Sequence, residues 1–319
     1  MAEFSPLLQL YGRKLWSSRT IEMILVVGAT GLLGSEICLK LTGRGEKVRG
    51  LIRLTSSSEK VESLRRCGVE LCVGDLKDPA SLAVACRDVD AVISTASSTL
   101  SRQPGDSIES VDESGQLHLV EAAKSAAVRR FVFVSFRRSS GISFPVADAK
   151  AQVENAIADM NFTVIQATYF MEVWLSPMLG FDYANATARI YGPGTQPISW
   201  VSLPDVAEMC VRALQNPAAE RKVIEFGGPE MLSPNEVIAR FESIGGRRFK
   251  CEHIPEDALR AQYQGATDPM QKSFAGLMLA YSAGDAIDMT SIQERFGMTL
   301  TTIDQYARRA LGHATMRES

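Results

Sequence analysis

The sequence is poor in the residues that build metal centres and disulfide frameworks. Its 319 residues include only three histidines and six cysteines, and no two cysteines form a C-x-x-C pair. A histidine-rich metal centre is therefore not expected. Scattered cysteines of this kind are typical of reduced thiols in the core of a cytoplasmic protein.

Long hydrophobic runs and a strong net charge are also missing. No apolar run approaches the roughly 20 residues of a membrane-spanning helix. The formal net charge of −3 gives no reason to expect nucleic acid or an anionic membrane as a partner. Residues 1–22 lack the apolar core and cleavage site of a secretory signal, so we interpret them as an N-terminal tail. The expected location is the cytoplasm, with a plastid or another targeted location left open by the tail.

A glycine-rich turn follows the first apolar run of the chain. Residues 23–27 are apolar and of strand length, and glycines follow in the spacing G-x-x-G-x-x-G. The first glycine allows a sharp turn, the second lets a pyrophosphate approach the main chain, and the third lets a helix pack closely on the sheet. A flexible loop would also be rich in glycine, but flanking strand and helix patterns favour a dinucleotide site. The expected contact residues are Gly28, Thr30, Gly31, Leu32, Leu33 and Gly34.

Strand and helix patterns alternate after this turn, which is typical of βαβ units. We therefore expect an α/β fold: a doubly wound parallel Rossmann sheet with a smaller, mostly helical substrate lobe. The nucleotide-binding core spans 23–169, a strand near 222–228 completes the sheet, and 170–319 mainly forms the lobe. The other expected strands are 23–28, 47–53, 69–74, 91–95, 130–135 and 163–168. The expected helices between them are 32–42, 58–67, 79–86, 108–127 and 147–160.

The second expected strand ends without the acidic residue that NAD enzymes place there. Arg53 stands at this point, and Thr55 and Ser56 follow it. A carboxylate would accept from the ribose 2′-hydroxyl of NAD, whereas an arginine fork suits the 2′-phosphate of NADP. The pattern favours NADP(H), although Arg53 can also be a surface charge at a strand end.

Three further strand ends carry candidate cofactor contacts. Asp75 and Leu76 follow the third strand, and Asp75 can accept from the adenine amino group or simply form a turn. Ala96 and Ser97 follow the fourth strand, where small side chains leave room for a cofactor. Arg137 and Arg138 follow the fifth strand and can face cofactor phosphate, an acidic substrate or only water.

These motifs together resemble the NmrA-like and isoflavone-reductase-like group of atypical short-chain dehydrogenases and reductases. The matching segments are residues 28–34, Arg53, 74–76, 120–124, 130–135, 149–154 and 201–207. The resemblance covers most of 23–228, and the last part of the chain matches only in general character. It implies an NADP-binding Rossmann domain with a variable substrate lobe. That group includes NADPH-dependent reductases, quinone reductases and cofactor-binding regulators without turnover.

The catalytic residues follow from the same resemblance. Lys150 matches the family lysine, but Val146 occupies the position of the tyrosine that classical members use. Isoflavone-reductase-like members also lack that tyrosine, so Lys150 is expected to hold the nicotinamide ribose and assist proton transfer. Lys150 shares a helix face with apolar Val153, although its amine can instead reach water beside Glu154.

Two more residues are candidates for contact with the substrate. Ser135 ends the fifth strand, where it can hydrogen-bond a carbonyl or serve only as a turn residue. Tyr169 follows the sixth strand and is a candidate proton donor or a pocket wall.

The sequence predicts an NADPH-dependent reductase of a small carbonyl, quinone or enone-like compound. The alternative is an NADP(H)-binding redox sensor of NmrA type that does not turn the cofactor over. A sugar-nucleotide epimerase or dehydratase is disfavoured because that chemistry needs the tyrosine that Val146 replaces. The substrate is not specified by any motif, and a protein partner or a homodimer stays open.

Overall fold

Seven parallel strands form the central sheet of the protein. The computed structural model describes residues 21–100, 103–138 and 141–317, so residues 1–20 of the expected tail lie outside it. The strand order is β10-β6-β5-β4-β1-β2-β3, which reverses direction between β1 and β4. The strands are β1 (Ile24–Val27), β2 (Val48–Ile52), β3 (Glu70–Val73), β4 (Ala91–Ser94), β5 (Arg130–Phe136), β6 (Phe162–Ala167) and β10 (Lys222–Phe226). In open α/β sheets, such a reversal marks the place where ligands bind.

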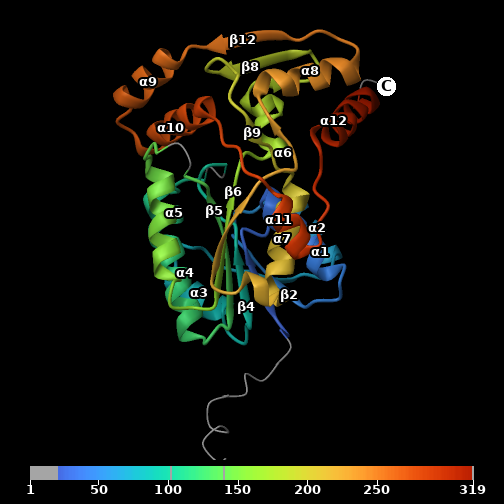
Figure 1. The fold of residues 1–319 in the computed structure, drawn as a ribbon. Helices are drawn as coiled ribbons and strands as arrows, with labels where there is room; N and C mark the ends of the chain where they lie inside the picture. Colours follow the sequence, from blue (N-terminus) through green and yellow to red (C-terminus); the bar gives the residue numbers. More distant parts are fainter. Residues whose placement is uncertain (1–20, 101–102, 139–140, 318–319) are drawn as a thin grey trace, which may run out of the picture.

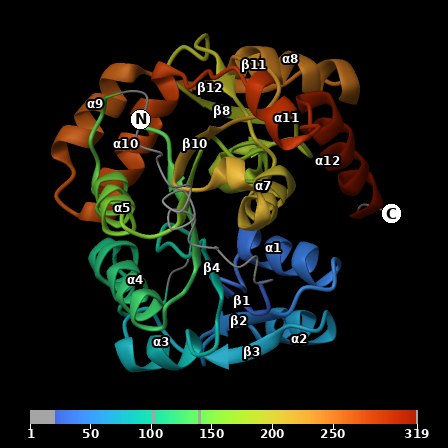
Figure 2. The same ribbon diagram turned by 60° about the horizontal axis from the view of Figure 1, so that its bottom comes forward.

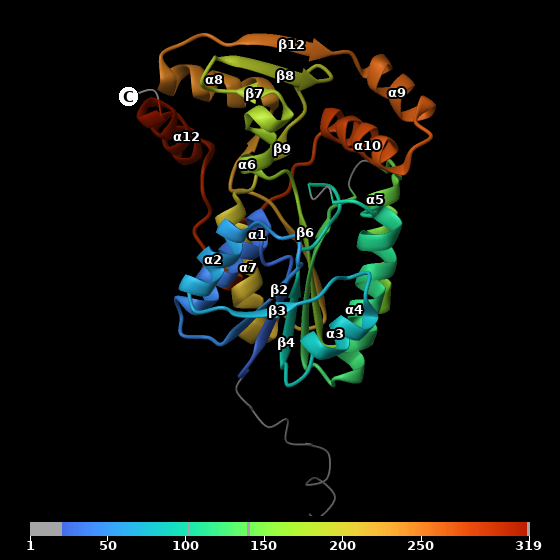
Figure 3. The same ribbon diagram turned by 180° about the vertical axis from the view of Figure 1, so that it is seen from behind.

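Two groups of helices cover the two faces of this sheet (Figures 1 and 3). One face carries α1 (Leu32–Thr42), α2 (Ser58–Arg66) and α7 (Leu203–Gln215), and α1 packs against α7 (Figure 2). The other face carries α3 (Pro79–Ala85), α4 (Ser114–Ser125) and α5 (Pro145–Ala156). A strand covered on both faces must be apolar throughout, and all four residues of β1 are buried. The expected doubly wound α/β fold is confirmed.

The expected helix over 108–127 differs in its first part. Residues Ile108–Glu113 form a π-helical segment, η2, and regular α-helix begins only at Ser114. Ser107 and Ser110 form a reciprocal capping box at its start, and the wide turn brings the Asp112 carboxylate onto Ser98 after β4. Periodicity alone could not reveal this segment, because one extra residue in a turn leaves the apolar pattern almost unchanged.

The lobe lies above the carboxyl edge of the sheet and contains more strand than expected (Figure 1). A sheet of order β12-β8-β7 and a pair β11-β9 accompany its helices. Residues 250–254 belong to the lobe that was expected to be mostly helical, but they form strand β12. Four of the five residues of β12 are exposed, so the strand carries little apolar signal. Its parallel pairing with β8 keeps it extended.

The strands of the lobe are β7 (Phe181–Asp182), β8 (Thr187–Tyr191), β9 (Ile198–Ser199), β11 (Met231–Leu232) and β12 (Lys250–Ile254). Its helices are α6 (Met171–Trp174), α8 (Pro234–Gly245), α9 (Glu256–Gly265), α10 (Pro269–Ala283), α11 (Thr290–Phe296) and α12 (Ile303–Arg317). Short 3-10 turns span Pro177–Leu179 and Pro217–Ala219.

Candidate nucleotide and substrate site

A cavity of about 490 Å³ lies along the carboxyl ends of β1 to β5. It runs from the glycine turn and the end of β2 to α5 and the first residues of the lobe. Of the candidate residues predicted from the sequence, the four that do not line it are Gly34, Arg137, Arg138 and Tyr169. The cavity therefore brings together the two halves of the expected site, one for the dinucleotide and one for its reacting partner.

The glycine turn has the geometry that a phosphate cradle needs. Gly28 has a φ of +87°, which L side chains rarely adopt, and its carbonyl accepts from the Gly31 N–H at 2.9 Å. A Cβ on Gly34 would lie 2.1 Å from the Gly28 oxygen, so only glycine lets α1 begin here. A Cβ on Gly31 would meet only that oxygen, at 3.1 Å, and no other atom lies within 4 Å of it. These residues fit a pyrophosphate at the N-terminus of α1.

Arg53 lines the cavity at the end of β2, and its guanidinium is paired. Nη1 of Arg53 donates to Asp106 at 2.7 Å, and Lys77 donates to the other Asp106 oxygen at 2.7 Å. Asp106 belongs to the segment between β4 and η2. Its own burial would raise its pKa, but the hydrogen bonds from Lys77 and Arg53 outweigh that effect and lower it.

Asp75 has the turn role that was one of its two expected functions. Its Oδ1 accepts from the Lys77 N–H at 2.9 Å, and Lys77 Nζ lies 3.8 Å from Oδ2. Because Asp75 also lines the cavity, its contact with adenine stays a prediction.

Lys150 lies at the other half of the cavity, almost fully buried. Its Nζ donates to the Val134 carbonyl at 3.1 Å and lies 4.9 Å and 5.2 Å from the ring centres of Phe133 and Phe136. Burial lowers the pKa of Lys150, and the nearby Asp112 and Glu154 carboxylates offset only part of that effect. An amine held in this way suits proton transfer near neutral pH better than a surface lysine does.

The hydroxyl of Ser135 does not point freely into the cavity. It donates to Glu154, which also accepts from Gln166 at 3.0 and 3.1 Å. Glu154 thus holds Ser135 rather than the Lys150 amine, although Glu154 follows Lys150 by one helical turn. Ser135 lines the cavity, and its contact with a substrate carbonyl stays a prediction.

The two arginines after β5 are engaged by the protein itself. Arg137 pairs with Asp285 of the lobe and lies 3.1 Å from Glu225. Arg138 lies 3.7 Å from Glu154. Arg137 therefore ties the lobe to the sheet.

Tyr169 lies in an aromatic cluster of the lobe rather than on the cavity wall. Its ring centre is 4.8 Å from Trp174 and 5.7 Å from Tyr281. Burial raises the pKa of Tyr169 well above its ordinary value, with the charges of Asp285 and Tyr281 acting in the same direction. A phenol in this setting is a poor proton donor to the cavity.

Replacing Tyr169 with phenylalanine is expected to change the turnover rate less than about twofold. The ring keeps its packing, and the lost hydroxyl does not face the cavity. Tyr169→Ala, in contrast, would cost about 3–5 kcal/mol of folding free energy through the hole it leaves. Steady-state rates and thermal unfolding measure the two effects. A hundredfold fall in the Tyr169→Phe rate at unchanged stability would instead make Tyr169 the proton donor.

Apolar side chains form the wall beyond Lys150. Phe136 ends β5, Phe170 and Val173 stand at the entry to the lobe, and Met178 and Leu203 complete this end. Such a wall excludes water and suits a flat, weakly polar compound.

Asp106 and Asp112 were not predicted from the sequence. Asp106 lines the cavity, and Asp112 follows Val111, which also lines it. Asp112 is 1% exposed and accepts from the Ser98 N–H at 3.0 Å, while its Oδ1 has no partner within the described residues. No local pattern marks Asp106, because its partner Arg53 lies far away in the sequence. An acidic residue on an otherwise apolar helix face was the one available signal for Asp112.

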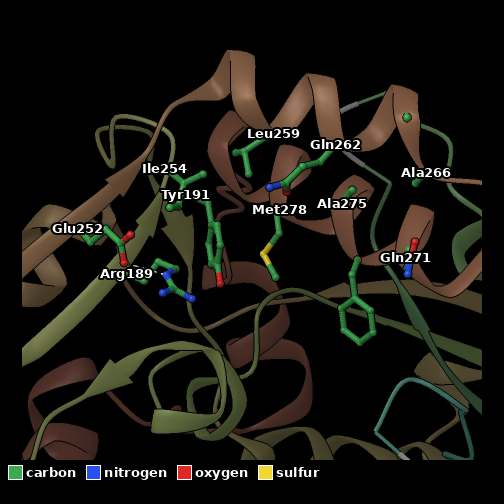
Figure 4. A pocket seen from close by; sticks show the side chains of 12 residues that line it. Arg189, Tyr191, Glu252, Ile254, Leu259, Gln262, Ala266, Gln271, Ala275 and Met278 are labelled. Atoms are coloured by element: carbon green, nitrogen blue, oxygen red, sulfur yellow. Dashed lines mark hydrogen bonds and ion pairs between the residues drawn. The ribbon is translucent and has the colours of Figure 1, made fainter.

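A second cavity, of about 590 Å³, lies in the lobe between β8, β12, α9 and α10 (Figure 4). Tyr191, Met278 and Gln262 extend into it, and Arg189 pairs with Glu252 at its edge. None of the predicted cofactor residues lines this cavity. It is therefore separate from the nucleotide site.

The sequence matches the NmrA-like family over residues 20–307. The chain belongs to the NmrA-like family. Within the described residues, no helix is long and apolar enough to cross a membrane. In the same residues, no group of histidine, cysteine and acidic side chains could hold a metal ion.

Relatives in this family have different roles. The photosystem II assembly factor Ycf39 of Synechocystis is 28% identical over 91% of this chain and 90% of its own length. The isoflavone reductase homolog IRL of Zea mays is 30% identical over 90% of this chain and 98% of its own length. The NADPH-dependent quinone oxidoreductase QOR2 of Escherichia coli, solved with NADPH, has the same fold, with a TM-score of 0.73 and 20% identity over 90% of this chain and 99% of that one. The expected NADP(H) agrees with the nucleotide in that structure.

Proposed function

We propose that this protein is an NADPH-dependent reductase of a small quinone, carbonyl or enone-like compound. One observation carries the proposal: a buried lysine lines the same cavity as a glycine phosphate cradle and an apolar wall. The bound NADPH would supply a hydride. The residues of this chain would hold the dinucleotide, position the acceptor and manage one proton.

Each part of the cavity has a distinct task in this proposal. The turn at Gly31 takes the pyrophosphate, and Arg53 takes the 2′-phosphate. Phe136 and Phe170 shield the acceptor from water, which strengthens electrostatic interactions there. Lys150 holds the nicotinamide ribose through Nζ and delivers a proton to the reduced oxygen, directly or through water.

The test is oxidation of bound NADPH in a single turnover by a panel of quinones, enones and aldehydes. We expect at least one quinone or enone to oxidise the bound cofactor faster than it does free NADPH. Tight binding of NADPH without oxidation by any acceptor would refute the reductase and favour the second candidate.

The second candidate is a non-catalytic NADP(H)-binding redox sensor. The Lys150 amine already donates to Val134 and the Ser135 hydroxyl to Glu154, so both candidate catalytic groups are engaged. The family relationship to a named assembly factor is compatible with this role. Such a sensor would present its lobe to a protein partner in a way that depends on the bound nucleotide. The cytoplasmic location and the plastid alternative stay predictions in both cases.

A further inference from the structure

The end of β2 has an acidic partner that comes from another part of the chain. Asp106 reaches Arg53 from the segment between β4 and η2, and one of its oxygens also accepts from Lys77. Only 2% of its side chain is exposed, yet Asp106 lines the nucleotide cavity. Gln103 also binds Thr55 through its side chain, so this segment is held against the β2 end at two points.

Arg53 and Asp106 thus place opposite charges at the end of β2, the position that sets the preference for NAD or NADP in dinucleotide-binding folds. A carboxylate at this position accepts a hydrogen bond from the ribose 2′-hydroxyl and repels a 2′-phosphate, whereas an arginine binds the 2′-phosphate. Each carboxylate oxygen of Asp106 accepts one hydrogen bond from a cation, which leaves lone pairs for a hydroxyl. A 2′-phosphate on Arg53 would have to share the guanidinium with Asp106.

We propose that Asp106 is a second determinant of cofactor choice in this protein. Its carboxylate takes the place of the acidic residue that is missing at the end of β2. It lowers the preference for NADP(H) that Arg53 creates, and it can accept a hydrogen bond from the ribose 2′-hydroxyl of NAD(H). This inference rests on the proposed nucleotide binding but not on turnover.

The test is calorimetric binding of NADPH and NADH to the full chain and to Asp106→Asn. The amide oxygen can still accept from Arg53 or Lys77, so the loop contact is kept while the charge is removed. ADP-ribose and its 2′-phosphate serve as redox-inert probes of the same site. Asp159→Asn is the matched control: it makes the same charge change on an exposed side chain at the amino edge of the sheet.

We expect Asp106→Asn to raise the ratio of NADPH to NADH affinity about tenfold, and to change the ratio for the two ADP-ribose probes in the same direction. Asp159→Asn should leave both ratios unchanged. An unchanged ratio in Asp106→Asn, or an equal loss of both affinities, would overturn the proposal and leave Asp106 a purely structural residue. All of these measurements report equilibrium binding. Failure of the protein to oxidise NADPH would therefore refute the proposed reductase activity and leave the proposal for Asp106 unaffected.

Discussion

Replacing Lys150 with methionine is expected to slow oxidation of bound NADPH on the order of 10²- to 10³-fold. Methionine keeps a long apolar stem in the buried site but removes the only amine among the residues that face the apolar end of the described cavity. NADPH affinity should fall less than about tenfold, because the glycine turn and Arg53 keep their contacts. Single-turnover kinetics and calorimetry measure these two effects separately.

The pH dependence gives this prediction a second readout. If protonated Lys150 donates the proton, the rate falls as pH rises through its pKa, which burial has lowered from the ordinary lysine value. The Lys150→Met variant should lose that limb of the profile.

The matched control is Lys124→Met on the neighbouring helix α4. Lys124 pairs with Asp159 at 3.0 Å and does not line the cavity, so its loss should not change the rate. Thermal unfolding of both variants shows whether the chain is still folded. If the Lys150→Met variant oxidises NADPH at a rate within twofold of the unmodified protein, Lys150 has no role in proton transfer.

Two glycine-to-alanine substitutions, at Gly31 and Gly34, are both expected to weaken NADPH binding, but for different reasons. In Gly34→Ala the new Cβ would lie 2.1 Å and 2.7 Å from backbone atoms of Gly28, which cannot move aside without opening the turn. We expect a loss of about 3 kcal/mol in the free energy of unfolding and no detectable binding of NADPH. In Gly31→Ala the one close atom lies at 3.1 Å, so stability should change by less than about 1 kcal/mol.

Gly31→Ala should nevertheless weaken NADPH binding at least about tenfold, because its methyl group fills the phosphate cradle. Gly265→Ala is the control, since nothing lies within 4 Å of the added methyl group. Chemical denaturation and calorimetry separate folding from binding. Normal NADPH affinity in Gly31→Ala would place the pyrophosphate elsewhere.

The sheet was predictable because its physical signals are local. A buried parallel strand must be apolar throughout, and the glycine turn marks where β1 meets α1. Helix α1 was predicted to the residue, and the strand at 222–226 that completes the sheet was also found. Strand β12 was not, because four of its five side chains face solvent and its extended form depends on pairing with β8.

The site was predictable where one element supplies the residues, and not where distant segments meet. The cradle and Lys150 each lie on a single recognisable element. Asp106 meets Arg53 only through tertiary structure. Tyr169 was expected to be a proton donor or a pocket wall, but aromatic rings of the lobe pack around it. The partners of Arg137 come from the lobe and from β10, so its structural role could not be inferred either.

The most direct test of the reductase is transfer of deuterium from NADPH labelled at C4 of the nicotinamide to an acceptor in a single turnover. We expect deuterium in the reduced product, a slower rate with the labelled cofactor, and transfer that is slowed about 10²- to 10³-fold in Lys150→Met. Bound NADPH that persists with every acceptor, while its affinity stays high, would contradict the proposed reductase activity.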